Sequence, residues 1–195
     1  MTSDLVRAAG EGDAAAVRAA LDGGADVNAR GPGGRTAVTA ASLNEHAEVV
    51  RLLIDAGADV DAQDEERNNA VLVCGVTGNV EVLREVLRAG PDLRLTNRYG
   101  GIAHIPASER GHVEMVRELL AAGIDVDHVN RLGWTALLEA VMLGDGGERH
   151  QRIVQLLIDA GADVDLADGE GVTPLAHARE RGYDRIAALL EAEQP

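Results

Sequence analysis

A spacing of 33 residues recurs along this chain of 195 residues. Glycine stands at Gly24, Gly57, Gly90, Gly123 and Gly161, which gives three gaps of 33 residues and one of 38. Two other series keep the same phase, namely Thr36, Asn69, Ile102, Thr135 and Thr173, and Asp26, Asp59, Asp92, Asp125 and Asp163. An insertion near Gly144–Arg149 explains the longer gap. Five copies in phase predict an array of similar units that lean on one another in a row.

Each internal copy also contains a helix with an apolar stripe. The stripe reads Val49, Val50, Leu53 and Ile54 in one copy, at the spacing of one helix face. Equivalent residues recur in the next three copies: Val82, Leu83, Val86 and Leu87; Met115, Val116, Leu119 and Leu120; Ile153, Val154, Leu157 and Ile158. The glycine after each stripe is expected to end the helix in a left-handed conformation.

Three segments carry a resemblance to the ankyrin repeat: Gly171–Leu175 (GVTPL), Gly111–Leu120 (GHVEMVRELL) and Gly57–Ala62 (GADVDA). A 33-residue period with helix starts of the T-P-L type is that family's signature. The resemblance covers nearly the whole chain. It implies an all-α solenoid of stacked helix-turn-helix units joined by β-hairpin-like loops. We expect one domain over residues 1–195, with a capping repeat at 2–30, internal repeats at 31–63, 64–96, 97–129 and 130–167, and a closing repeat at 168–195.

The third and fourth repeats depart from the pattern. Arg67 occupies the place of a hairpin glycine, which predicts a distorted or opened turn. Ile102 occupies a capping position but has no polar side chain, so the next helix is expected to start at Pro106. His104 falls where other repeats place Val38, Val71, Leu137 and Leu175 in the core.

Composition narrows the possible partners and locations. Eighteen Lys+Arg against 33 Asp+Glu give a net charge of −15, which argues against binding to nucleic acid or to anionic membranes. No apolar run is long enough for a signal peptide or a membrane span. The single cysteine, Cys74, aligns with alanines of other repeats and is expected to fill a core position. We expect a cytoplasmic monomer, and the use of arginine without lysine suggests a GC-rich bacterial source.

Catalytic and metal-binding signals are sparse. The chain has no phosphate-binding glycine loop, no HExxH and no paired CxxC, so we expect no cofactor and no metal. His46, His112 and His150 share one repeat position and are expected to be architectural, whereas His128 is expected to be solvated in a loop. The aspartate ladder is expected to support the loop backbone, because Ca²⁺ needs about six or more oxygens at one point.

One chemical alternative stays open. His104 in an aliphatic position needs a hydrogen-bond partner, or it could face a ligand or sense pH. Glu139 and His177 share a helical position in adjacent repeats. With His150, Asp145 and Glu148 of the insertion they could form an acid–base or metal cluster. This alternative is a catalytic or small-molecule-binding protein that uses His104 or the Glu139/His177 region.

The resemblance implies a different main function, because most ankyrin-repeat proteins bind other proteins with their hairpin tips and first helices. Carried over to this chain, the binding residues are Arg35, Glu66, Asn68, Arg98, Tyr99, Glu109, Arg110, Arg131, Leu132, Trp134, Met142 and Leu143. Trp, Tyr and Arg are enriched at binding hot spots. Trp134 and Tyr99 lie on neighbouring hairpins and could form one patch, although Trp134 could instead pack on its own hairpin.

The sequence thus favours a non-enzymatic adaptor or inhibitor that binds a protein partner through residues 31–143. A spacer without a specific partner fits the aromatic and arginine content less well.

Overall fold

The computed structural model describes residues 2–193, in which all regular secondary structure is helical. The chain forms two compact units, Met1–Arg98 and Tyr99–Pro195. The helices of the first unit are α1 (Thr2–Glu11), α2 (Ala14–Asp22), η1 (Pro32–Gly34), α3 (Ala37–Leu43), α4 (Ala47–Asp55), α5 (Ala70–Thr77) and α6 (Val80–Arg88). Those of the second unit are α7 (His104–Glu109), α8 (Val113–Ala121), α9 (Ala136–Met142), α10 (Glu148–Asp159), α11 (Pro174–Glu180) and α12 (Asp184–Glu191). The predicted repeat boundaries stay predictions.

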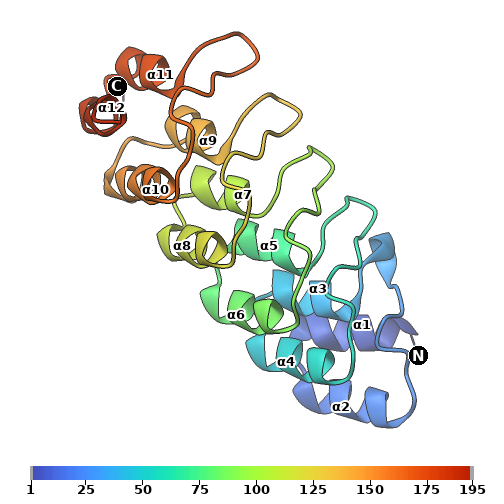
Figure 1. Ribbon diagram of the computed structural model, residues 1–195. Coiled ribbons are helices and arrows are strands. Elements are labelled where there is room, and N and C mark those ends of the chain that lie inside the picture. The colour runs from blue at the N-terminus through green and yellow to red at the C-terminus, as the bar shows by residue number, and fades with distance from the viewer. Residues whose placement is uncertain (1, 194–195) are drawn as a thin grey trace. The chain divides into compact units, whose positions relative to one another are not determined.

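In each unit the helices come in pairs. The first helix of one pair packs on the first helix of the next pair, and the second helices pack on one another in the same way (Figure 1). In the first unit α1 packs on α3 and α3 on α5, while α2 packs on α4 and α4 on α6. In the second unit α7, α9 and α11 form one layer, and α8, α10 and α12 form the other. The apolar stripes predicted from the sequence face these contacts, because Val50, Leu83, Met115 and Ile153 are fully buried.

Small residues let the first helices approach closely. Ala41, Cys74, Ala107, Ala140 and Ala178 occupy one repeat position and are fully buried. Burial raises the pKa of the Cys74 thiol to about 12, which keeps it protonated and unreactive at neutral pH. The expectation that Cys74 fills an alanine position in the core is therefore confirmed.

Side-chain caps explain where most first helices begin. Thr36, Asn69, Thr135 and Thr173 each accept a hydrogen bond from the backbone N–H three residues later. Each of these bonds satisfies an amide that has no partner within its helix.

The helix α7 is the exception. Ile102 offers no side-chain acceptor, and α7 has no side-chain cap. The prediction that this helix starts at Pro106 is wrong, because α7 begins two residues earlier, at His104. The Ile105 amide donates to the Ile102 carbonyl at 3.1 Å. Pro106 is tolerated because amides in the first turn of a helix need no partner within the helix.

Histidines at one repeat position lie at or near the start of three of the second helices, and His150 is inside the first turn of α10. His46 and His112 are the residues that precede α4 and α8. His46 Nε2 lies 3.1 Å from the Gly10 carbonyl, and His150 Nε2 lies 3.0 Å from the Glu109 carbonyl. His46 and His150 therefore link two successive helix pairs, which confirms an architectural role for them.

The five-residue insertion ends in a short hydrogen-bonded turn before α10. Asp145 Oδ1 accepts from the Gly147 amide at 2.9 Å and lies 2.7 Å from His150 Nδ1. These contacts hold the pKa of Asp145 below its usual range, the Gly147 hydrogen bond being the largest cause. Asp145 thus orients the imidazole ring whose other nitrogen reaches Glu109.

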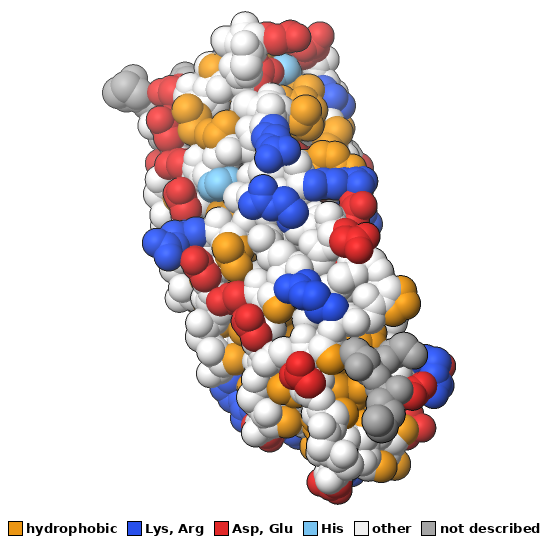
Figure 2. Space-filling model, turned by 90° about the vertical axis from the view of Figure 1, so that its right-hand side faces the viewer, with side chains coloured by type: hydrophobic (Ala, Val, Ile, Leu, Met, Phe, Trp, Pro, Cys, Tyr) orange, Lys and Arg blue, Asp and Glu red, His pale blue; other side chains and the backbone are white. Residues whose placement is uncertain are grey.

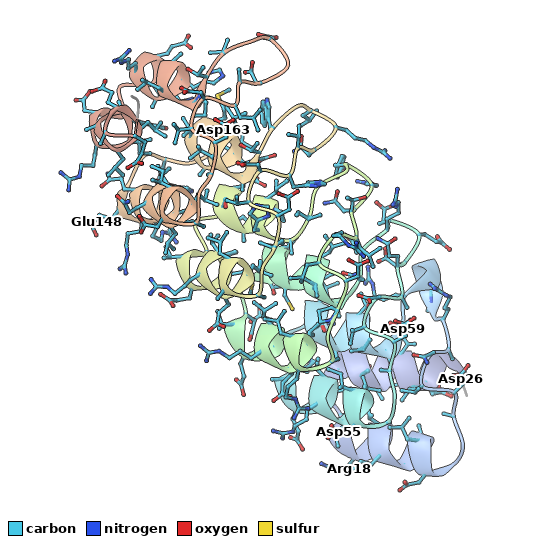
Figure 3. The ribbon with its side chains drawn as sticks, viewed as in Figure 1. Arg18, Asp26, Asp55, Asp59, Glu148 and Asp163 are labelled. Carbon is cyan, nitrogen blue, oxygen red and sulfur yellow. The ribbon has the colours of Figure 1, made fainter. Side chains whose placement is uncertain are left out.

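The aspartates of the series Asp26, Asp59, Asp92, Asp125 and Asp163 support the loops between repeats, as expected from the sequence: Asp59 Oδ1 accepts from the Asp61 amide and Asp163 Oδ1 accepts from the Asp165 amide, both at 3.0 Å. Asp59 and Asp163 lie in such loops (Figure 3). The Asp59 amide donates to Asn28 Oδ1 at 2.8 Å, and the Asp163 amide donates to Asp127 Oδ1 at 2.9 Å. Charged side chains of the second helices point outward instead, as Arg18 on α2 and Asp55 on α4 do in Figure 3.

The predicted distortion at Arg67 does not occur. Arg67 adopts the left-handed conformation of a glycine, with φ 62°. Its amide donates to the Asp64 carbonyl at 2.9 Å, and the Asp64 amide donates to the Asn68 carbonyl at 2.8 Å. The second unit closes its hairpin in the same way through Gly133, which has φ 78°. The hydrogen bonds that close the turn outweigh the backbone strain of an L-residue at this position.

Candidate functional site

Hairpin loops project from one side of each unit, and backbone hydrogen bonds join consecutive hairpins. In the first unit the Glu65 amide donates to the Gly33 carbonyl at 3.0 Å, and the Arg98 amide donates to the Glu66 carbonyl at 3.2 Å. In the second unit the Arg131 amide donates to the Tyr99 carbonyl at 3.0 Å. The backbone of Tyr99 is therefore hydrogen-bonded to the neighbouring hairpin.

In the second unit His128 adds a side-chain contact between consecutive hairpins. Its Nε2 lies 2.7 Å from the Gly100 carbonyl, in the preceding hairpin. The expectation of a solvated His128 is wrong, because the side chain is half-buried and bridges two loops. A sequence pattern could not reveal this contact, since it depends on how two hairpins 28 residues apart come together.

The predicted binding residues of the first unit have partners in the hairpins: Arg98 pairs with Glu66, while Arg35 and Asn68 both contact Asp64. Arg35 Nη2 lies 3.5 Å from Asp64 Oδ2, and Arg98 forms an ion pair with Glu66. The Asn68 amide donates to Asp64 Oδ1 at 2.8 Å. Part of the charge on this hairpin surface is thus neutralised within the unit.

The predicted binding residues of the second unit include much of its exposed apolar surface. The large hydrophobic side chains exposed in the described part of the chain are Tyr99 (56%), Val129 (45%), Leu132 (61%) and Leu143 (51%). All belong to the second unit, and Trp134 beside them is half-buried. In the upper part of Figure 2, which this unit occupies, hydrophobic and arginine side chains lie close together. Exposed apolar groups of this kind mark interaction surfaces when they gather.

Three hairpins are also tied to a helix or a neighbouring hairpin by the side chain of their entry residue. Asp64, Asn130 and Asp168 hold this position in their repeats. In each, Oδ1 accepts from two hairpin amides; for Asn130 these are the amides of Leu132 at 2.9 Å and Trp134 at 3.1 Å. These entry residues were not among the predicted site residues, although they recur in phase with the other series and could have been found from that period.

The second polar atom of each entry residue has a different partner. Asp64 Oδ2 faces the Arg35 guanidinium, and Asp168 Oδ2 lies 2.7 Å from His177 Nε2. The Asn130 amide nitrogen instead donates to Glu139 Oε1 at 2.9 Å. Glu139 and His177 therefore have separate partners, and so does His150 of the insertion.

Glu139 is the buried acid of this region, with 5% of its surface exposed. Burial raises its pKa to about 7, like-charge repulsion from Glu109 adds to the rise, and the Asn130 hydrogen bond opposes it. The carboxyl group is consequently poised to change charge near neutral pH. Glu109 lies at the end of α7, which packs on the helix α9 that carries Glu139.

His104 has a partner in a neighbouring loop, as the simpler expectation held. It is fully buried, with Nε2 3.4 Å from the Val126 carbonyl and Nδ1 without a hydrogen bond. Burial lowers its pKa to about 4, so the ring is neutral at pH 7. Two surface cavities lie away from His104, one lined by residues that include Asp4 and Ala25, the other by residues that include Arg152 and Arg185.

Within residues 2–193 no three His, Cys, Asp or Glu side chains are arranged to hold a metal ion. None of the helices in that range has the length and hydropathy needed to cross a membrane.

Comparisons with known proteins agree with the architecture. The family model for ankyrin repeats (3 copies) matches residues 5–97, 70–168 and 103–194. The ankyrin repeat protein YahD of Escherichia coli K12 is 58% identical over 59 residues, which is 30% of this chain and 29% of YahD. The chain therefore matches less than a third of that curated relative.

Solved structures extend the likeness over the whole chain. An ankyrin repeat domain of Acinetobacter baumannii AYE is 48% identical with a TM-score of 0.92, covering 96% of both chains. The ankyrin repeat domain of Bcl-3 is 27% identical with a TM-score of 0.86, covering 97% of this chain and 85% of that one. A third similar structure is the predatory endopeptidase Bd0816 of Bdellovibrio bacteriovorus in complex with the immunity protein Bd3460. A chain of that structure shares the fold at 22% identity, with a TM-score of 0.83 and 98% coverage of both chains.

The stacked helix pairs and hairpins, the family match and the bacterial relatives agree with one another. Ankyrin repeats are protein-interaction modules, and this chain belongs to the ankyrin-repeat family.

Proposed function

We propose that this protein is a non-catalytic adaptor or inhibitor that binds a protein partner with its hairpin tips and first helices. The observation that carries the proposal is the exposure of Tyr99, Leu132 and Leu143 on one unit of an otherwise well-buried chain. Leaving large apolar side chains in water is unfavourable, and a partner surface would remove them from it.

The rigid setting of these side chains supports the same function. Tyr99 and Leu132 occupy equivalent places in two hairpins that the Arg131–Tyr99 hydrogen bond joins. A preformed surface loses less conformational freedom on binding than a mobile loop does. The fold itself is compatible with holding a protein, since a protein of the same fold was solved in complex with an endopeptidase.

The catalytic alternative has weaker support. His104 is enclosed in the core, and the polar atoms of Glu139, His177 and His150 are engaged with separate neighbours. General acid–base catalysis requires groups that converge on a substrate position, which these separate pairs do not provide. We therefore assign these residues structural or recognition roles.

The proposal is tested by replacing Tyr99 and Trp134 together with alanine. The partner is first isolated from the source bacterium by affinity capture, and its affinity for the purified chain is then measured by isothermal titration calorimetry. We expect affinity to fall about tenfold or more, with an unchanged circular dichroism spectrum, because aromatic anchors dominate interface energies.

Two further variants make the result decisive. Replacing the exposed pair Tyr99 and Leu132 repeats the test without disturbing the half-buried Trp134. Replacing Arg185 and Leu189 on α12, away from the hairpins, should leave affinity unchanged. Wild-type affinity in both hairpin variants would refute the proposed surface.

A further inference from the structure

The cavity beside Arg152 and Arg185 is a cleft in the layer of second helices of the second unit, on the side away from the hairpins (Figure 1). Its volume is about 260 Å³, and its lining residues come from α10 and α12, which pack on each other: Glu148, Gln151, Arg152, Gln155, Arg185 and Leu189. A space of this size is smaller than most pockets for small molecules, and it suits a single side chain of another protein.

The two arginines of the cleft reverse the charge that earlier repeats carry. Arg152 and Arg185 each come directly before a fully buried isoleucine of their helix. The equivalent position holds an acid in three earlier repeats, namely Glu48, Glu81 and Glu114. Three residues later those repeats carry Arg51, Arg84 and Arg117, whereas the last two carry Gln155 and Ala188. The pattern of one acid and one base has therefore been replaced by a single base.

This replacement leaves the two arginines without countercharges. In earlier repeats Glu48 Oε1 lies 3.0 Å from Arg18 Nη2, and Glu114 Oε1 lies 3.4 Å from Arg117 Nη2. Within residues 2–193 the side chains of Arg152 and Arg185 form no ion pair or hydrogen bond. The chain has 33 Asp+Glu against 18 Lys+Arg, so the reason is where the acids lie and not a shortage of them. The cleft thus offers two unengaged guanidinium groups to a ligand.

Glu148 limits the charge of that ligand. It lies one turn before Arg152, forms no ion pair with it in the described part of the chain, and points outward from α10 (Figure 3). Two arginines and one glutamate give the cleft one net positive charge. One carboxylate balances this charge, whereas a phosphate group with nearly two negative charges exceeds it.

The glutamines of the cleft favour a peptide as the source of the carboxylate. Gln151 Nε2 donates to the Gly146 carbonyl and Gln155 Nε2 donates to Asp159 Oδ1, both at 2.8 Å. Their carboxamide oxygens accept no hydrogen bond from the described residues, so they can accept from N–H groups of a ligand. A peptide supplies backbone N–H groups next to a side-chain carboxylate, and Leu189 offers an apolar wall to its methylene groups.

We propose that the cleft between α10 and α12 binds an acidic side chain of a second protein, different from the partner of the hairpins. The planar fork of a guanidinium matches the two oxygens of a carboxylate, and two such forks hold it from both helices. The net charge of −15 repels an acidic segment at a distance, but salt at physiological strength screens charges beyond about 8 Å. The contacts inside the cleft therefore decide binding.

The test uses three capped peptides that differ at one position: acetyl-leucyl-glutamyl-leucine amide and its counterparts with glutamine and with phosphoserine. Each is titrated at pH 7 into the ¹⁵N-labelled full chain, while NMR follows the Leu189 amide and the Nε–H groups of Arg152 and Arg185. We expect a saturable shift with the glutamate peptide. The glutamine peptide should bind about tenfold more weakly or worse, and the phosphoserine peptide no more tightly than the glutamate peptide.

Variants assign the effect to the cleft. Arg152→Glu and Arg185→Glu each restore the acid of the earlier repeats, so both should keep the circular dichroism spectrum of the wild type. Each should weaken binding of the glutamate peptide about tenfold or more, monitored through the Leu189 amide. Arg149→Glu is the matched control, because it makes the same charge change at an exposed position of α10 outside the cleft lining. It should leave peptide affinity unchanged.

Each contrary outcome has a definite meaning. No saturable shift with the glutamate peptide, equal binding of the glutamine peptide, or full binding by both cleft variants would overturn the site. Equal weakening by Arg149→Glu would show that only overall charge acts, and tenfold tighter binding of phosphoserine would overturn the carboxylate assignment. The variant with Tyr99 and Leu132 replaced should bind the peptide like the wild type, so this site and the hairpin surface can fail independently.

Discussion

Replacing Glu139 with glutamine should stabilise the protein in a manner that depends on pH. The ordinary pKa of the side chain is 4.5, and in the folded chain burial raises it to about 7. A raised pKa means that the folded state prefers the protonated acid. Stability is therefore fully present below pH 4.5, falls between pH 4.5 and 7, and stays reduced above pH 7.

The magnitude follows from the two pKa values. Each pKa unit corresponds to about 1.4 kcal/mol, so full ionisation of Glu139 costs about 3 kcal/mol. Solvent screening reduces this little, because the side chain is 5% exposed. Glutamine has nearly the same shape, carries no charge, and keeps an oxygen that can accept from Asn130 Nδ2. The variant should therefore gain about 3 kcal/mol at pH 8.5 and almost nothing at pH 4.

Urea unfolding followed by circular dichroism measures this difference. With a urea dependence of about 2 kcal/mol per molar, the unfolding midpoint should rise by roughly 1.5 M at pH 8.5. Glu180→Gln, which removes an exposed charge, should change the midpoint little at either pH. Parallel stability curves for wild type and Glu139→Gln across this pH range would show that Glu139 is not a buried titrating acid.

Two further substitutions test other features of the fold. His104→Leu should stabilise by about 1 kcal/mol at pH 8, because it removes the unpaired Nδ1 from the core. The pKa of His104 in the folded chain is lowered from 6.5 to about 4, so wild-type stability declines as pH falls from 6.5 to 4. The stability advantage of His104→Leu should therefore grow over that range. A constant difference between the two proteins would contradict this expectation. Arg67→Gly should raise the thermal midpoint, because it removes the strain of a left-handed arginine, which amounts to about 0.5–1 kcal/mol. Gly133→Ala places a side chain at the equivalent left-handed position and should lower the midpoint. Differential scanning calorimetry measures both changes.

Regular features of the fold could be predicted because they depend on residues close in sequence. Thr36 and Asn69 cap helices through amides three residues away, and Gly57 takes the left-handed conformation expected after a helix. Periodicity then placed Val50 and Leu83 in the core. Local rules failed at α7 and Arg67, where packing and turn hydrogen bonds outweighed the preferences of single residues.

The candidate site was predictable only in part. Tyr99, Leu132 and Leu143 could be chosen from the family pattern and are exposed, and their part in binding stays a prediction. The hydrogen-bond partners of Glu139 and His177 could not be predicted, because each bond joins a helix to a hairpin loop and depends on the folded conformation of that loop. The contact of His128 with Gly100 has the same origin.

By itself the sequence determined that similar helix pairs recur, where most of them begin and end, and which family they belong to. These properties follow from a repeated pattern of apolar residues, caps and glycines, which acts over a few residues at a time. Tertiary structure decided which charges find a countercharge, because that depends on distances between side chains from different repeats. It gave Asp64 and Asp168 positive partners and left Glu139 beside a neutral amide.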